Sequence, residues 1–125
     1  MSTKPAKTLT AALHSIIGMS NLRPSDSGVS GAIIWVSAGE FEGKTIQHGP
    51  RIKVVLGVKV SSEGLKDAVT VTITKPPRVL GTLPANIKQQ VVTFVELNYD
   101  VLVQYWTNAI STKEMLGRII AVGQK

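Results

Sequence analysis

Apolar and polar residues alternate along positions 51–61, in the stretch RIKVVLGVKVS. Because successive side chains of a strand point to opposite faces, this alternation predicts a strand with one buried face. Residues 68–74, AVTVTIT, alternate in the same way, and the intervening SEGLKD is rich in turn residues. The two runs therefore predict an antiparallel hairpin, which ends at Pro76 and Pro77 because proline cannot donate to a ladder.

Residues 97–106, LNYDVLVQYW, also have apolar or aromatic residues at the odd positions. We therefore expect a strand here as well, at the end of a long extended run from about Ile87 to Trp106. The run is long for one strand, so a bend is expected near Glu96 or Asn98. The polar face of this strand would carry Asn98, Asp100 and Gln104.

One helix is predicted near the end of the sequence, over residues 111–123. Ser111 and Glu114 have the spacing of a capping box, in which each side chain satisfies a backbone N–H of the first turn. Gly123 suits a left-handed C-terminal stop. The apolar stripe of this helix consists of Met115, Leu116, Ile119 and Ile120.

The remaining patterns complete a single α+β domain spanning residues 1–125. GAIIWVS (31–37) predicts a further strand, whereas the apolar spacing of residues 9–19 fits a helix or a strand equally well. We expect an N-terminal segment or hairpin over 1–29, an antiparallel sheet of about five strands over 30–106, and the helix over 111–123.

The predicted helix is too small for the predicted sheet. A helix of about 11 residues covers roughly 160 Å², whereas five strands of some eight residues present roughly 630 Å² per face. An uncovered apolar face of this size indicates an interface, and the simplest is a twofold dimer in which helices of both chains cover a shared sheet. If the N-terminal segment folded over that face as a long helix, the uncovered area would be smaller.

Composition narrows the class of protein. The chain of 125 residues is 43% hydrophobic and 18% charged, as expected of a globular domain, and its formal net charge is +6. It has no cysteine, no apolar run long enough to span a membrane, and no apolar core typical of a signal peptide. The positive excess suits a polyanion, above all a nucleic acid, although simple solubility explains a charge of this size equally well.

The positive charge falls on the predicted solvent face of the strands, beside hydroxyl and amide side chains. Lys and Arg neutralise phosphates, and Ser, Thr, Asn and Gln contact phosphates or base edges, so this face is a candidate RNA platform. A plain solvated face is the alternative, because threonine is simply a good strand former. Glu96 and Asp100 on the same face would repel phosphate, and stacking aromatic residues are missing there.

Signals for catalysis are poor. His14 and His48 stand apart from each other and from any carboxylate cluster, and no nucleophile elbow, P-loop or metal-ligand spacing occurs. A carboxylate pair, Glu96 and Asp100, lacks a partner nucleophile. We expect neither an enzyme nor a cofactor, metal ion, membrane or small-molecule substrate.

Three stretches resemble the coat protein of the small single-stranded RNA bacteriophages, the leviviruses. SGAIIWVS (30–37) resembles the family's second strand, and IKVVLGVKVSS (52–62) with VTVTITKP (69–76) resembles its central hairpin. LNYDVLVQYWTNAISTKEML (97–116) resembles its long last strand and the entry into its helix. The order and spacing of these stretches, rather than any single motif, carry the resemblance.

The resemblance implies a fold and a function. Two chains would pair into one continuous antiparallel sheet as an intertwined dimer, with each helix packed across the partner. Dimers would then build an icosahedral virion shell around the RNA genome in the bacterial host cytoplasm. The helix-free face of the sheet would look inward and bind RNA.

Residues are assigned to these roles by position. The RNA-binding face would include Arg51, Lys53, Lys59, Ser61, Thr70, Thr72, Thr74, Asn98 and Gln104, with Ala32, Val55, Gly57, Glu96 and Asp100 on the same face. The dimer interface would include Tyr99, Val101, Val103, Tyr105, Met115, Leu116, Ile119 and Ile120. The loop between dimers would include Leu80, Gly81, Thr82, Leu83 and Pro84. The alternative function is a small basic β-sheet module, similar to an OB-fold, that binds single-stranded nucleic acid.

Overall fold

The computed structural model describes residues 19–38, 40–41, 44–45, 49–57 and 67–123. The ambiguous segment 9–18 lies outside the described residues, as do Lys59, Ser61, His14 and His48.

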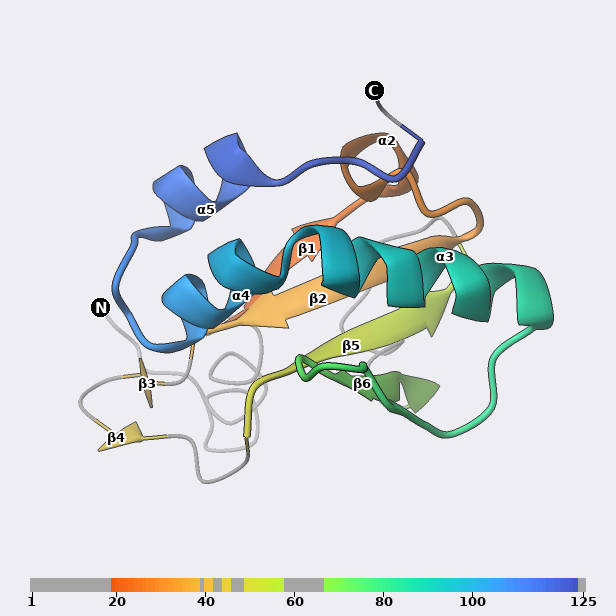
Figure 1. The fold of residues 1–125 in the computed structure, drawn as a ribbon, viewed down its shortest axis with the longest axis horizontal. Coiled ribbons are helices and arrows are strands. Elements are labelled where there is room, and N and C mark those ends of the chain that lie inside the picture. Colours follow the sequence, from red (N-terminus) through yellow and green to blue (C-terminus); the bar gives the residue numbers. More distant parts are fainter. Residues whose placement is uncertain (1–18, 39, 42–43, 46–48, 58–66, 124–125) are drawn as a thin grey trace, which may run out of the picture.

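A five-stranded antiparallel sheet follows the order of the chain as a meander, β1-β2-β5-β6-β7 (Figure 1). A separate short hairpin, β3-β4, is inserted between β2 and β5. The strands are β1 (Met19–Leu22), β2 (Ala32–Ser37), β3 (Glu40–Phe41), β4 (Lys44–Thr45), β5 (Arg51–Leu56), β6 (Val69–Thr72) and β7 (Val79–Leu80). The described helices are α2 (Pro24–Ser27), α3 (Ala85–Leu97), α4 (Tyr99–Trp106) and α5 (Thr112–Arg118). The mixed α and β class and the antiparallel sheet of five strands are therefore confirmed, but the sheet lies between Met19 and Leu80 and not over residues 30–106.

The predicted central hairpin is confirmed in both pairing and face. β5 pairs antiparallel with β6, with Lys53 opposite Thr70 and Arg51 opposite Thr72. Ile52 and Val54 point into the core beside Val71, as the alternation predicted. The strand predicted over residues 31–37 is also present, as β2.

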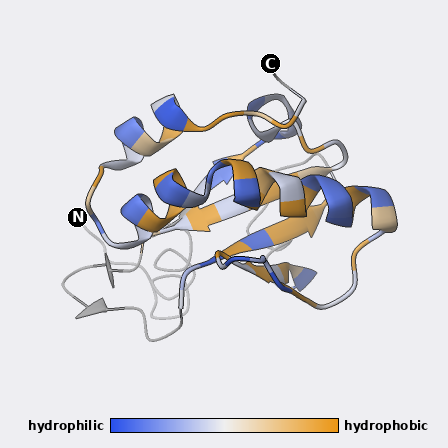
Figure 2. Ribbon diagram, in the orientation of Figure 1, coloured by the Kyte–Doolittle hydropathy of each residue, from blue (hydrophilic) through white to orange (hydrophobic). Residues whose placement is uncertain are grey.

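The helices α3, α4 and α5 lie on one side of the sheet, and the core fills the space between the two layers (Figure 1). Figure 2 shows hydrophobic residues on the strands beneath α3 and α4, and alternating polar and apolar residues along the helices. The helices contribute Ile87, Val91, Phe94, Val95, Leu102, Tyr105 and Met115 to this core.

The strand predicted over residues 97–106 is wrong, because this stretch is the end of α3 followed by α4. The buried positions are Ile87, Val91, Phe94, Val95, Asn98, Leu102 and Tyr105, and they follow the three-to-four-residue spacing of one helix face. Of the apolar residues at odd positions between 97 and 105, only Tyr105 is among these buried positions. Leu97 is 45% exposed, and Tyr99, Val101 and Val103 are only partly buried on the flanks of α4.

Because residues 85–106 form helices and not a strand, the sheet is smaller and the helical layer larger than predicted. The uncovered apolar area from which a dimer was inferred is therefore not present. The strands of the sheet have two to six residues each and together span roughly 350 Å². The helices α3, α4 and α5 have a combined footprint of roughly 420 Å². One chain therefore covers the apolar face of its own sheet without a partner.

The capped helix is confirmed, but it is shorter than predicted. Ser111 Oγ accepts a hydrogen bond from the N–H of Glu114 at 3.1 Å, and the Glu114 carboxylate accepts one from the N–H of Ser111 at 2.9 Å. The helix ends at Arg118, and Ile119 is extended with φ −64° and ψ 134°. Gly123 does have a left-handed φ of 88°, but it does not end the helix.

The segment after α5, residues 119–122, is called the strap here because two fixed points hold it. The Asn98 side chain accepts from the N–H of Ile120 at 2.7 Å and donates to its carbonyl at 2.9 Å. The N–H of Val122 donates to the carbonyl of Ser27 at 2.7 Å. These bonds replace the helical ones that would have continued α5, which explains its early end.

Candidate nucleic-acid interface

The sheet face opposite the helices is called the open face. Its side chains form rows that run across the strands. The strand register aligns Asn21, Trp35, Lys53, Thr70 and Leu80 in one row across the sheet. A neighbouring row contains Arg51 and Thr72. No residue of the five strands in the described part of the chain is acidic, so the charged side chains that these strands contribute to this face are all positive.

The β2 part of the open face is apolar and buried, whereas the β5–β6 part is basic and accessible. On β2, Ile33 and Trp35 are only 1% and 2% exposed, and neither belongs to the core beneath the helices. On β5 and β6, by contrast, Arg51, Lys53 and Thr70 are partly exposed. A ligand that approaches this face therefore meets the β5–β6 part.

Lys53 and Thr70 form the centre of the basic part. The Lys53 ammonium donates to Thr70 Oγ1 at 3.1 Å, which uses one of its three N–H donors. Thr70 accepts this bond, so its own proton points elsewhere and can serve a phosphate oxygen. The pair presents a positive charge with donors around it, as a phosphate-binding surface requires.

Arg51 extends the basic part toward the end of β5. Its Nε donates to the carbonyl of Gly49 at 3.3 Å, which fixes one edge of the guanidinium. The remaining four N–H groups of a guanidinium suit the planar, bidentate recognition of phosphate.

Asn98 and Gln104 do not lie on the open face, which corrects two predicted RNA contacts. Asn98 is 2% exposed between α3 and α4, where its amide holds the strap and also donates to the carbonyl of Phe94 at 3.0 Å. Gln104 lies on α4 and accepts from Arg118 at 3.3 Å. Both predictions rested on the strand that proved to be a helix.

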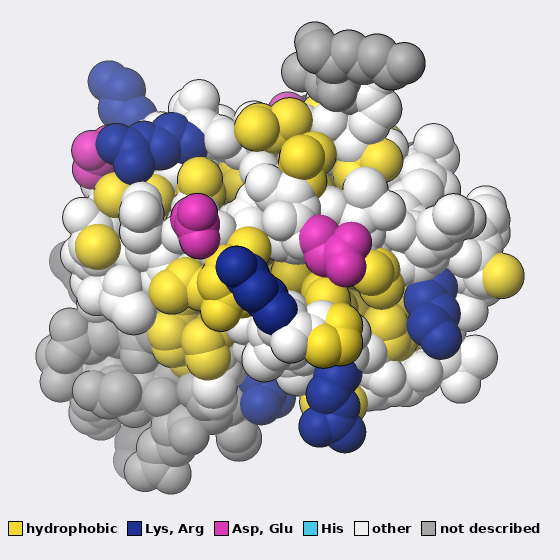
Figure 3. Space-filling view, in the orientation of Figure 1, with side chains coloured by type: hydrophobic (Ala, Val, Ile, Leu, Met, Phe, Trp, Pro, Cys, Tyr) yellow, Lys and Arg dark blue, Asp and Glu magenta, His cyan; other side chains and the backbone are white. Residues whose placement is uncertain are grey.

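The two carboxylates that were expected to repel phosphate are also absent from the open face. Glu96 and Asp100 lie on α3 and α4, in the layer on the other side of the sheet. Ala32, also expected on the open face, is fully buried in the core beneath the helices. Figure 3, which views the molecule from the helical layer, shows Lys and Arg interspersed with Asp and Glu there. The two sides of the sheet thus differ in charge pattern.

Most of the predicted dimer contacts are used within the chain. Tyr105 and Met115 are buried, and the Tyr105 hydroxyl is hydrogen bonded to Thr112 Oγ1 at 2.9 Å. Tyr99 lies beneath Lys75, whose ammonium is 4.4 Å from the ring centroid. Val101, Val103 and Ile119 are partly buried, so the large exposed members of the set are Leu116 and Ile120, each at 45%.

The predicted loop between dimers links the sheet to the helical layer. Leu80 ends β7 and is 46% exposed, whereas Leu83 is buried at 8%. Gly81 has a φ of 150°, which L side chains rarely adopt, and Pro84 is the N-cap residue of α3. Leu80, Thr82 and Pro84 are thus presented on the surface of this loop.

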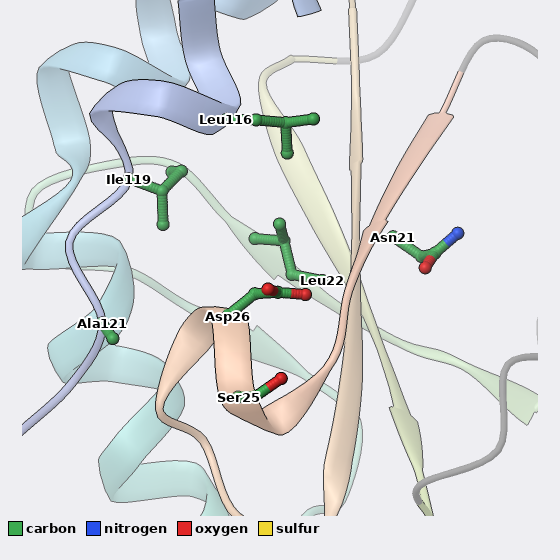
Figure 4. A pocket seen from close by; sticks show the side chains of 7 residues that line it. All are labelled: Asn21, Leu22, Ser25, Asp26, Leu116, Ile119 and Ala121. Carbon is green, nitrogen blue, oxygen red and sulfur yellow. The ribbon is translucent and has the colours of Figure 1, made fainter. Parts of the chain in front are cut away.

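A hollow of about 400 Å³ lies at the β1 edge of the sheet, between α2, β1 and the segment from α5 into the strap (Figure 4). It is lined by Asn21, Leu22, Ser25, Asp26, Leu116, Ile119 and Ala121. This lining holds a carboxylate and no cation, so it does not suit a phosphate.

Two other kinds of site are missing from the described residues. They hold no group of three His, Asp or Glu side chains placed to bind a metal ion. Within the same residues, no helix is both long and apolar enough to cross a membrane.

Comparison with known proteins identifies no relative: no family model, no curated protein and no solved structure matches the chain.

Proposed function

We propose that the chain is a structural coat protein of the levivirus type, which pairs with a second copy and assembles into an icosahedral shell around single-stranded RNA. The observation that carries the proposal is the difference between the two faces of the sheet. A meander sheet is covered by helices on one side and presents Arg51, Lys53 and Thr70 on the other, without an acidic strand residue among those described. The resemblance at residues 30–37 and at the central hairpin supports the same assignment.

The dimer in this proposal forms through sheet edges rather than through an uncovered face. In the described sheet, β1 and β7 each have a single neighbouring strand. Unpaired edge strands are templates for pairing with another chain. Two copies joined in this way would form the continuous sheet that the resemblance implies, with Leu116 and Ile120 available for added contacts.

The alternative, a single-strand-binding module similar to an OB-fold, depends on stacking aromatic side chains. Within the described residues of the five-stranded sheet, Trp35 is the aromatic side chain on the open face, and it is 2% exposed. Stacking of bases on this face is therefore not favoured, whereas contact with the RNA backbone requires no aromatic side chain.

Expression of the protein alone tests the proposal. Size exclusion with absorbance at 260 and 280 nm, followed by electron microscopy, should reveal uniform closed shells that contain nucleic acid. A discrete monomer or dimer that never assembles at any ionic strength would refute the coat-protein function. If such a species still bound oligonucleotides, the binding-module alternative would replace it.

A further inference from the structure

Arg78 lies outside every element, yet the register places it in the basic row of the open face. β6 and β7 pair with Val71 opposite Val79, so Thr72 stands opposite Arg78. Two hydrogen bonds confirm this: the N–H of Thr72 donates to the carbonyl of Arg78, and the N–H of Arg78 donates to Thr72 Oγ1, both at 2.9 Å. Because Arg51 flanks Thr72 on its other side, the row reads Arg51, Thr72, Arg78.

The hydroxyl protons near Arg78 are all committed within the chain. Thr74 Oγ1 donates to the carbonyl of Pro76 at 2.7 Å. The hydroxyls of Thr72 and Thr74 are 2.7 Å apart, so Thr72 is the donor of that bond, since a hydroxyl has a single proton. Thr72 and Thr74 therefore have no proton left for a phosphate oxygen, unlike Thr70.

This relay of hydroxyls has a different use, which is to shape the turn between β6 and β7. It links Thr72 to Thr74 and Thr74 to Pro76, and Thr72 then receives the backbone N–H of Arg78. The chain is thereby folded back so that Arg78 lies beside β6. Thr72 and Thr74, which the sequence suggested as RNA contacts, instead hold the backbone of Arg78 in place.

The three cations are spaced for a chain of phosphates. Arg51 and Lys53 are two residues apart on one strand, about 6.7 Å, and Arg51 and Arg78 are two strands apart, about 9.6 Å. In the described part of the chain, no carboxylate lies within ion-pair distance of these three side chains. Long cations at such spacings can neutralise successive phosphates of one strand.

We propose that Arg78 is a phosphate-binding residue of the RNA site, so that the RNA backbone crosses β5, β6 and β7 from Arg51 and Lys53 to Arg78. This inference rests on the proposed RNA-binding function and specifies how that site meets its ligand. Thr72 and Thr74 act through Arg78 and do not contact the RNA themselves.

The salt dependence of binding tests the inference. The probe is a fluorescent oligouridine, titrated with the full-length protein at several salt concentrations. Each phosphate contact to a single strand contributes about 0.7 to the slope of log K against log salt. Arg78→Gln should lower the slope by about 0.7 and weaken binding about fourfold at 0.15 M salt. Lys88→Gln is the matched control, because Lys88 is an exposed cation on α3, in the opposite layer.

Two variants of Thr72 separate positioning from contact. Thr72→Val removes the hydroxyl that holds the Arg78 backbone and should lower the slope as Arg78→Gln does. Thr72→Ser keeps the hydroxyl and should restore the wild-type slope. A merely structural role of Thr72 would change the melting temperature and leave the slope of the folded protein unchanged.

The outcomes separate this inference from the function on which it rests. If the wild type binds oligouridine and Arg51→Gln lowers the slope while Arg78→Gln does not, only the role of Arg78 is refuted. If the wild type shows no salt-dependent binding, the RNA-binding open face itself is refuted. If the slopes are as expected but no shells assemble, the coat-protein function is refuted, and phosphate binding by Arg51, Lys53 and Arg78 is still supported.

Discussion

Asn98 connects three parts of the chain through one buried side chain. Its amide bonds the carbonyl of Phe94 in α3 and both backbone groups of Ile120 in the strap, and its own carbonyl begins the ladder of α4 by accepting from Leu102. A side-chain amide carries the same donor and acceptor as a peptide group, so Asn98 pairs with Ile120 as a neighbouring strand would.

Replacing Asn98 with alanine should destabilise the protein by about 1–2 kcal/mol, because the part-buried hydrogen bonds to Ile120 and the buried one to Phe94 are lost. Urea denaturation of unassembled protein measures this, with the exposed Asn86→Ala as the control. Oligouridine binding of the folded Asn98→Ala protein should match the wild type. A loss of binding without a loss of stability would return Asn98 to the RNA site.

Two glycines near the strap are expected to respond to alanine in opposite ways. Gly28 has a φ of 78°, and an added Cβ would collide with the backbone of Val122. Gly28→Ala should therefore cost at least about 1–2 kcal/mol from the left-handed backbone alone. Gly117 lies inside α5, and an added Cβ would meet open space, so Gly117→Ala should stabilise the protein by about 0.5–1 kcal/mol. Equal effects in thermal melts would contradict this account of the strap.

Among the elements, α5 depends on a cap that responds to pH. Hydrogen bonds from the backbone and side chain of Ser111 lower the pKa of Glu114 below its ordinary value of 4.5, with a smaller contribution from Arg118. A carboxylate with a lowered pKa stabilises the fold above its unfolded pKa, and this contribution is lost as the pH falls through the folded pKa.

Acidification should therefore loosen α5 in the wild type more than in a variant with a neutral cap. Glu114→Gln keeps an oxygen acceptor for the N–H of Ser111 but cannot titrate. Between about pH 6 and about pH 3, the wild type should lose more unfolding free energy than Glu114→Gln. Parallel stability curves for the two proteins over this range would show that the cap carboxylate does not contribute.

The elements also show which sequence signals are decisive. The cap of α5 was predictable because both of its bonds are local, between Ser111 and Glu114. The hairpin β5-β6 was predictable because its alternation is uninterrupted. The stretch 97–106 was not, because apolar residues at Tyr99, Val101 and Val103 mimic a strand while the buried residues Asn98, Leu102 and Tyr105 follow a helix. Extending the count back to Ile87 and Val91 would have favoured the helix.

On the scale of the whole molecule, the sheet separates a basic surface from a mixed one. The candidate site was predictable for Arg51, Lys53 and Thr70, which depend on strand parity alone. Arg78 was not, because its position depends on a turn and on the register of a two-residue strand. The pairing of β6 with β7 depends on tertiary structure, and no local pattern in the stretch RVLGTLPAN predicts it.

The two layers should therefore differ in their effect on packaged RNA. The double variant Arg51→Gln with Lys53→Gln should reduce the ratio of absorbance at 260 to 280 nm of purified shells. The pair Lys88→Gln with Lys113→Gln removes the same charge from the helical layer and should leave the ratio unchanged. An equal reduction by both pairs would mean that total charge, and not the open face, governs packaging.

The position of the strap near residue 120 also determines when its contacts can form during synthesis. Val122 closes on Ser27, and Ile120 closes on Asn98, so the strap meets partners that were made long before it. At 5–20 residues per second, roughly 5–20 s separate the emergence of Ser27 from that of Val122. Until then the carbonyl of Ser27 and the amide of Asn98 lack these partners. A nascent chain that stops short of Ile120 would lack the hydrogen bonds from the strap to Ser27 and Asn98, and Asn98 would keep only its bond to Phe94. Loss of the strap would therefore disfavour incomplete chains.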